Sequence, residues 1–173
     1  MRWLLDNPEA SQAVSNIVKE AGGKIVGRTR LQKIFYLLNI AGYFDEFSFE
    51  YKHYGPFSEE LARATTMAAI TGSLEEEEIP TSWGGTYSVF LSKGIVEQPI
   101  DASKVELLQV ANEANPIDLE LSATALFLHA SGEPDPWEET KRRKPEKAKR
   151  IENAKILLQK LRQIRVPNPF PAF

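Results

Sequence analysis

Few side chains in this sequence have the type and spacing that catalysis or metal binding requires. Two histidines are present, His53 in "EYKHYGPFSEEL" and His129 in "ATALFLHA". Neither lies in an HxxxH or HxD spacing, so the sequence predicts no metal site. No serine nucleophile motif or carboxylate dyad accompanies His53, so a general base is not predicted either. Both imidazoles are expected to be packed and hydrogen-bonded. The four glutamates at 75–78 could attract calcium, but consecutive strand residues point to opposite faces and cannot converge on one ion.

The composition excludes several other kinds of chemistry. The chain has no cysteine, which excludes disulfides, thiolate zinc sites and cysteine nucleophiles. The segment "GGKIVGR" lacks the spacing of a phosphate-binding loop and no Lys-Ser/Thr follows it. We therefore expect a protein without a cofactor and without enzymatic activity.

The net charge of −3 is distributed unevenly along the chain. Between residues 133 and 165 there are 11 Lys/Arg and 6 Asp/Glu, whereas the remainder is acidic. The candidate phosphate-contacting run is Lys141, Arg142, Arg143 and Lys144. Two interpretations remain open: this run contacts nucleic acid, or a basic helix lies against the acidic body of its own chain.

The elements that must position these residues follow from hydrophobic periodicity and capping. The pattern predicts a helix, a helix, a strand, a helix and a β-hairpin, over residues 8–21, 30–41, 47–54, 59–71 and 74–94. Asn7, Thr29 and Ser58 are the expected N-caps of the three helices. This order is typical of a winged-helix unit with the hairpin as its wing, here within residues 1–100.

The stretch between the strand and the third helix combines a glycine, a proline and a capping serine. Gly55 and Pro56 are expected to end the strand, because glycine allows an abrupt turn and proline fixes its own φ. Ser58 then satisfies free amides at the start of the helix. Backbone conformation and helix capping account for the residues of this corner, so they do not indicate a catalytic role.

The rest of the chain is predicted to be a helical part over residues 101–166. Expected helices cover about 102–114 and 118–131, with a short helix within 132–143 and a long amphipathic helix over 145–164. Three prolines in 167–173 exclude regular structure from the tail. The fold class is therefore mainly α with a small β component, in one domain over 1–173.

Location and DNA binding can also be addressed from the sequence. The apolar run in "MRWLLDNPEASQ" is too short for a signal peptide, and no apolar stretch of 18 residues exists, so we expect a cytoplasmic protein that does not enter membranes.

The third helix offers one cation, Arg63, beside Glu59 and Glu60. Because duplex binding depends on cations that displace condensed counterions, DNA binding through this helix and the acidic wing is disfavoured.

Two separated segments resemble a known family. The run "GRTRLQKIFYLLNIAGYF", an aromatic strand and "YGPFSEEL" resemble the YwgA-like family and its wider relatives, the Panacea (SocA-like) antitoxin domains. The resemblance rests on Leu31-Gln32-Lys33 opening a helix and on Gly55-Pro56 after the strand. The segments "ELSATALFLHAS" and "KRRKPEKAKRIENAKILLQKL" resemble the C-terminal helices of the same family, so the similarity covers roughly 25–62 and 117–161.

The resemblance implies a mostly helical bacterial or phage domain that acts by binding another protein. Panacea domains neutralise toxins by direct contact, and SocA-like members deliver a toxin for proteolysis. The antitoxin branch typically has His before Gly-Pro and a small β-branched residue after it. Tyr54 and Phe57 stand at these places here, which favours the YwgA-like branch.

The leading hypothesis from the sequence is thus a cytoplasmic protein–protein interaction module, antitoxin-like or adaptor-like, whose partner is a toxin or a client delivered to a protease. The alternative is a winged-helix transcriptional regulator binding DNA; a homodimer is left open, and an enzyme has the weakest support. The candidate partner contacts, each with an alternative role inside its own domain, are Gln32, Lys33, Tyr36, Tyr54, Phe170 and Phe173.

Overall fold

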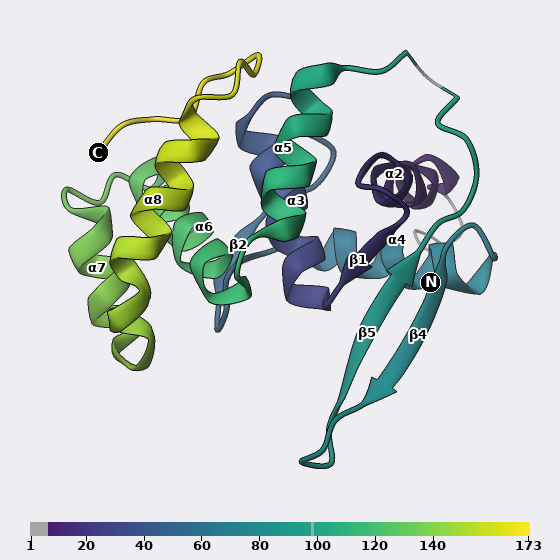
Figure 1. The fold of residues 1–173 in the computed structure, drawn as a ribbon, viewed down its shortest axis with the longest axis horizontal. Coiled ribbons are helices and arrows are strands. Elements are labelled where there is room, and N and C mark those ends of the chain that lie inside the picture. Colours follow the sequence, from purple (N-terminus) through teal and green to yellow (C-terminus); the bar gives the residue numbers. More distant parts are fainter. Residues whose placement is uncertain (1–6, 98) are drawn as a thin grey trace.

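The chain folds into a mainly helical structure with a small antiparallel β part (Figure 1). The computed structural model describes residues 7–97 and 99–173. The elements, in chain order, are α2 (Pro8–Glu20), β1 (Lys24–Val26), α3 (Arg28–Ile40), β2 (Glu50–Lys52), β3 (Gly55–Phe57), α4 (Glu59–Ile70), β4 (Glu75–Pro80), β5 (Thr86–Leu91), α5 (Ala102–Glu113), α6 (Pro116–Ala130), α7 (Pro136–Arg143), the 3-10 helix η1 (Pro145–Arg150) and α8 (Ile151–Arg162).

Two of the three predicted N-caps are confirmed. The Asn7 side chain accepts a hydrogen bond from Ala10 N at 3.1 Å, and the Ser58 hydroxyl accepts one from Leu61 N at 3.1 Å. The prediction for Thr29 is wrong, because α3 already begins at Arg28 after Gly27. Gly27 has a φ of 97°, which glycine adopts readily, and this turn leads directly from β1 into the helix.

A three-stranded sheet with the order β1-β5-β4 includes one strand that the sequence pattern did not predict. β1 has only three residues, so it is too short to show a period, and it forms by pairing with β5. Ile25 lies opposite Phe90 and both side chains are buried. The predicted β4–β5 hairpin is confirmed, and it extends away from the helices on the opposite side of the molecule from α7 and α8 (Figure 1).

The prediction of one strand over 47–54 that ends at Gly55-Pro56 is wrong. Residues Glu50–Lys52 form β2, the chain reverses, and Gly55–Phe57 pair back onto it as β3. Gly55 and Pro56 therefore belong to a second strand. Phe47 lies before β2 and outside the sheet. It packs into the core, where its ring meets that of Phe35 edge-on with centroids 5.6 Å apart.

The predicted helices of the C-terminal part are present, with one change. The long helix expected over 145–164 is divided into η1 and α8. In η1, the side chains of Lys147 and Arg150 bind carboxylates of α6. The apolar face of the amphipathic helix is buried as predicted: Ile151, Ala154, Leu157, Leu158, Leu161 and Ile164.

The C-terminal tail has no regular structure, as predicted, but it is fixed to the body. Asn168 N donates to Ala41 O at 2.9 Å, and the Asn168 side chain donates to Ile40 O at 2.8 Å. These bonds satisfy carbonyls at the end of α3 that have no partner within the helix. Every helix in the described residues is too short or too polar to cross a bilayer.

Candidate functional site

The two halves of the family-like motif contact each other. The Gln32 side chain donates to Ser58 O at 3.0 Å and accepts from Ser58 N at 2.8 Å. Next to it, Lys33 Nζ donates to Pro56 O at 2.7 Å. The start of α3 thereby fixes both ends of the short connection from β3 to α4. We call this set of contacts, made by Gln32, Lys33, Pro56 and Ser58, the α3 clamp.

Lys33 is an unusual member of the clamp because its amine is buried. The residue is 1% exposed, and this burial lowers the pKa of Lys33 to about 7. The negative charge of Glu120 opposes this fall, whereas the positive charges of Lys144 and Lys147 add to it. Since the amine is enclosed and already bonded to a backbone carbonyl, its role in this conformation is structural.

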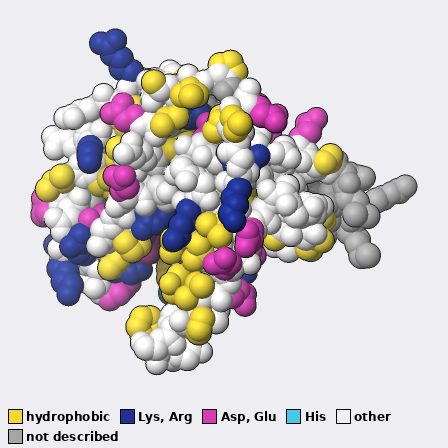
Figure 2. All heavy atoms as spheres, turned by 45° about the vertical axis from the view of Figure 1, so that its right-hand side comes forward, with side chains coloured by type: hydrophobic (Ala, Val, Ile, Leu, Met, Phe, Trp, Pro, Cys, Tyr) yellow, Lys and Arg dark blue, Asp and Glu magenta, His cyan; other side chains and the backbone are white. Residues whose placement is uncertain are grey.

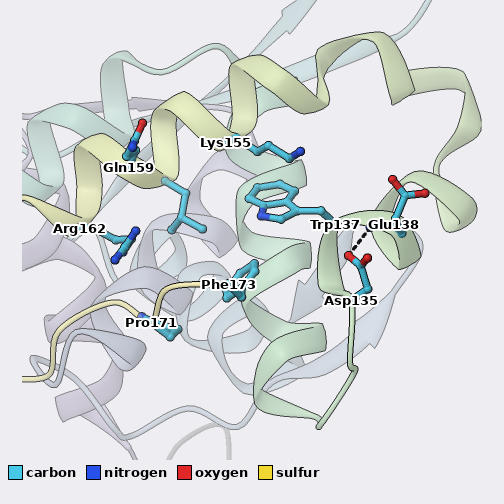
Figure 3. A pocket seen from close by; sticks show the side chains of 9 residues that line it. Asp135, Trp137, Glu138, Lys155, Gln159, Arg162, Pro171 and Phe173 are labelled. Carbon is cyan, nitrogen blue, oxygen red and sulfur yellow. Dashed lines mark hydrogen bonds between the residues drawn. The ribbon is translucent and has the colours of Figure 1, made fainter.

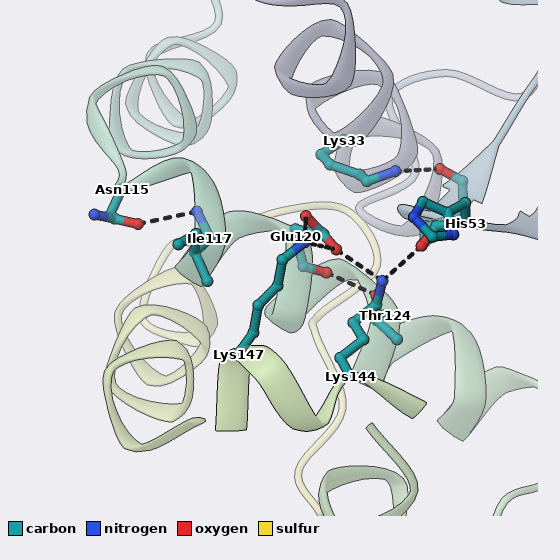
Figure 4. A network of polar contacts seen from close by, with 9 residues as sticks. Lys33, His53, Asn115, Ile117, Glu120, Thr124, Lys144 and Lys147 are labelled. Atoms are coloured by element: carbon teal, nitrogen blue, oxygen red, sulfur yellow. Dashed lines mark hydrogen bonds and ion pairs between the residues drawn. The ribbon is translucent and has the colours of Figure 1, made fainter. Parts of the chain in front are cut away.

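A second polar network lies on α6 and centres on Glu120, which is 5% exposed (Figure 4). Lys144 Nζ lies 2.7 Å from Glu120 Oε1, and Lys147 Nζ lies 2.8 Å from Oε2. Lys144 also donates to the backbone carbonyl of His53 at 2.9 Å. Although burial acts to raise it, the pKa of Glu120 is lowered by the hydrogen bonds and positive charges of the two lysines. We call Glu120, Lys144 and Lys147 the Glu120 network.

Gly55 of β3 lies against Thr124 of α6. A Cβ atom at this position would lie 2.5 Å from Thr124 Oγ1, and the φ of Gly55 is +87°. The Thr124 hydroxyl is itself held by a bond to Glu120 O at 2.8 Å. The glycine is therefore needed for contact with α6 as well as for the turn.

Part of the basic run pairs with acidic side chains of its own chain, in line with one of the two open interpretations. Arg142 and Arg143 pair with Glu139, and both pairs contribute hydrogen bonds that lower the pKa of Glu139 to about 2. Lys144 is 3% exposed and bound to Glu120. The assignment of Lys144 to phosphate contact is therefore wrong. Lys141, Arg142 and Arg143 are exposed, and the two arginines are paired with Glu139.

Cation–π contacts attach the same basic segment to the β2–β3 hairpin. The Arg143 guanidinium lies 4.7 Å from the ring centroid of Tyr51, and Lys147 Nζ lies 5.3 Å from that of Tyr54. An arginine or lysine over an aromatic ring at this distance is a favourable contact. The basic segment thus supports the hairpin that carries the motif.

Most of the side chains predicted to contact a partner are not on the surface. Gln32, Lys33, Tyr36 and Phe170 are each at most 5% exposed, so their assignment to an exposed contact surface is corrected: they belong to the clamp and the core. Tyr54 and Phe173 are 52% and 38% exposed.

The two histidines do not share one environment. His129 stacks on Phe173 with ring centroids 4.7 Å apart, so it is packed as predicted. His53 is exposed, and its ring meets only that of Tyr54 among the described aromatic side chains, so the prediction of a packed imidazole is wrong there. Within residues 7–97 and 99–173, no group of three or more His, Asp or Glu side chains could hold a metal ion.

A cavity of about 520 Å³ lies between α7, α8 and the tail (Figure 3). Its walls combine the rings of Trp137 and Phe173 with the charged side chains of Glu138, Lys155 and Arg162. The ring centroids of Phe173 and Trp137 lie 5.8 Å apart. The tail residue predicted to reach a partner therefore lines this cavity of its own chain.

The largest exposed hydrophobic side chains of the hairpin region form what we call the wing surface: Val26, Trp83 and Tyr87. Trp83 at the hairpin tip is 85% exposed, Tyr87 is 43% exposed and Val26 is 41% exposed. Figure 2 shows hydrophobic side chains along the projecting hairpin, with acidic side chains on one flank. The sequence predicted a hairpin over 74–94, and Trp83 was not among the predicted partner contacts.

Two other residues were missed although the sequence carries a signal for one of them. Glu120 is a carboxylate within the otherwise apolar and small-residue run "LELSATALFLHA", where a buried charge requires a partner. Thr124 carries no comparable signal, because its contact with Gly55 depends on the packing of α6.

Comparisons with protein-family models, with curated proteins and with solved structures found no match to this chain.

Proposed function

We propose that this chain is a non-enzymatic binding module whose partner is another protein. The observation that carries the proposal is the wing surface, where Trp83 is 85% exposed at the tip of a projecting hairpin. Exposed aromatic side chains of this kind are the commonest anchors of protein interfaces. The polar motif residues, by contrast, are occupied by internal contacts.

We further propose that α2, α3 and α4 with the β1-β5-β4 sheet form a winged-helix-like unit, and that α5 to α8 form a helical bundle packed on it. The sheet order and the projecting hairpin support the first part. In this arrangement the wing surface lies at the end of the molecule far from the bundle, free to meet a partner.

The resemblance to Panacea and YwgA-like proteins gives the proposal its biological form: an antitoxin-like or adaptor-like protein in a bacterial or phage cytoplasm. The two forms make different demands on the partner. An antitoxin-like protein restores growth when co-expressed with a toxic partner, whereas an adaptor-like protein shortens the partner's lifetime in the presence of the protease.

Site-specific photo-crosslinking tests the proposal. A photoreactive phenylalanine analogue replaces Trp83 in one variant and Ile156, a 64% exposed side chain on α8, in the control. We expect one protein to be crosslinked from position 83 and not from position 156. The Kd of its complex with the purified chain should rise about 30-fold in the Trp83→Ala variant. Crosslinking that does not differ between the positions, or an unchanged Kd, would contradict the proposal.

DNA binding remains the alternative, supported by the winged-helix-like order of elements. The helix α4 carries Glu59 and Glu60 in its first turn, and the basic run is mostly engaged in internal pairs. A gel-shift assay at low salt decides the point: retardation of duplex DNA that falls steeply with salt would favour the alternative.

A further inference from the structure

The outer edge of β4 is one of the two edges of the three-stranded sheet. β4 is the last strand in the order β1-β5-β4, and within the described residues only β5 pairs with it. An edge strand presents unpaired N–H and C=O groups, which can bind an extended segment by main-chain hydrogen bonds. In Figure 1 this edge lies on the projecting hairpin, away from α5 to α8.

A groove runs beside this edge, between β4 and α4. Its open part has a volume of about 890 Å³ and includes Ile70, which is 73% exposed. It shares Thr66 and Glu76 with a smaller cavity of about 200 Å³ whose walls include the rings of Phe57 and Phe90. A segment added to β4 would therefore place every second side chain over this groove, whose walls combine the apolar Ala69 and Ile70 with Glu76 and Glu78.

The charges of β4 determine what the other side chains of such a segment must be. Alternation along the strand puts Glu75 and Glu77 on one face of the sheet and Glu76 and Glu78 on the other. Glu76 and Glu78 lie 2.8 and 4.0 Å from the Arg28 guanidinium. Glu75 and Glu77 are exposed and make no ion pair with any described residue. They offer two carboxylates at a spacing of two residues.

A second copy of this chain does not fit the same edge. Antiparallel pairing of β4 with itself would bring glutamates of one strand opposite glutamates of the other, because four of its six residues are Glu. Like charges directly opposite each other in a sheet are destabilising. A segment with Lys or Arg at alternate positions has the complementary charge.

We propose that the edge of β4 binds an extended segment of a partner protein in which Lys or Arg alternates with apolar residues. The segment adds a strand to the β1-β5-β4 sheet, its cations lie beside Glu75 and Glu77, and its apolar side chains lie over the groove at Ile70. This inference rests on the proposed function and names the chemistry of the partner.

The first test pans a phage-displayed library of random 16-residue peptides against the full chain. We expect enriched peptides to alternate Lys or Arg with apolar residues. The best of them, made synthetically, should slow deuterium exchange at backbone amides of β4, since an added strand protects the edge. No enrichment, enrichment of acidic or Pro-rich peptides, or unchanged exchange in β4 would each overturn the proposal.

Paired variants test the two kinds of contact. The double change Glu75→Gln and Glu77→Gln should weaken binding of that peptide about four-fold, since each exposed ion pair contributes roughly two-fold. Its control, Glu106→Gln with Glu146→Gln, removes the same charge from exposed sites elsewhere and should change nothing. For the groove, Ile70→Asp should weaken binding at least about ten-fold, whereas Ile156→Asp should not. An equal effect of test and control variants would overturn the proposal.

Failure here is distinguishable from failure of the proposed function. If a protein is crosslinked at position 83 and the peptide results are negative, the binding module stands and strand addition at β4 is excluded. If peptides add to β4 and no protein is crosslinked at position 83, the edge site stands and the wing surface loses its role.

Discussion

Replacing Lys33 with methionine removes a buried amine whose protonation differs between the folded and the unfolded chain. Burial lowers the pKa of Lys33 from 10.5 to about 7 in the folded protein. Between these two values the unfolded chain binds more protons at this position than the folded chain, so the stability of the wild type rises with pH in this window. The side chain is 1% exposed, so solvent screening at the amine is small.

The size of the effect follows from the two pKa values. Each tenfold difference in proton affinity between the folded and the unfolded chain corresponds to about 1.4 kcal/mol. The stability of the wild type relative to Lys33→Met should therefore rise by about 2 kcal/mol between pH 7 and pH 9. Methionine also leaves Pro56 O without its donor, which costs about 1–3 kcal/mol at every pH. The second effect is an offset and does not change the slope.

Urea unfolding followed by far-UV circular dichroism at pH 7, 8 and 9 measures the free energy of unfolding of each variant. Subtracting the two curves cancels the titration of all groups that the substitution leaves unchanged. Lys160→Met is the matched control, because Lys160 is exposed and its substitution should give a difference that is independent of pH. A wild-type minus Lys33→Met difference that is flat or falls between pH 7 and pH 9 would refute the assignment of a buried, neutralised amine.

Two further substitutions test the contacts around α6. Glu120→Gln should lower the free energy of unfolding by about 3 kcal/mol, because it leaves the buried Lys144 cation without its counter-charge; the exposed Glu146→Gln serves as control, and a loss no larger than that of the control would disprove the role of the pair. Gly55→Ala should cost at least about 2 kcal/mol through its positive φ and its clash with the Thr124 hydroxyl. Part of this loss should return in combination with Thr124→Ala, as measured by a double-mutant cycle, and strictly additive losses would show that the two positions do not interact.

Local signals in the sequence were sufficient for much of the helical structure. Asn7 and Ser58 cap their helices because a capping side chain reaches an amide only three residues away, so the interaction is encoded within one turn. The inward face of α8 was equally predictable from its helical spacing. The short strands were not, because β1 and β3 exist through pairing with β5 and β2 and carry no period of their own.

The residues of the candidate site could be identified from the sequence, but the contacts between them could not. Gln32, Lys33, Gly55 and Ser58 were singled out from the motif, yet their spacing could not show that the first two side chains bind the backbone of the β3–α4 connection. The hairpin was predictable from the sequence, but the exposure of Trp83 follows from how far the hairpin projects from the helices.

Most helix starts, the amphipathic faces and the uneven distribution of charge could be predicted from the chain alone, since each depends on residues close together in it. The enclosure of Lys33, the pairing of the basic segment with Glu120 and Glu139, and the open edge of β4 became visible only in the folded molecule. Burial and charge pairing depend on which surfaces come together, and residues far apart in sequence meet only after the helices have packed.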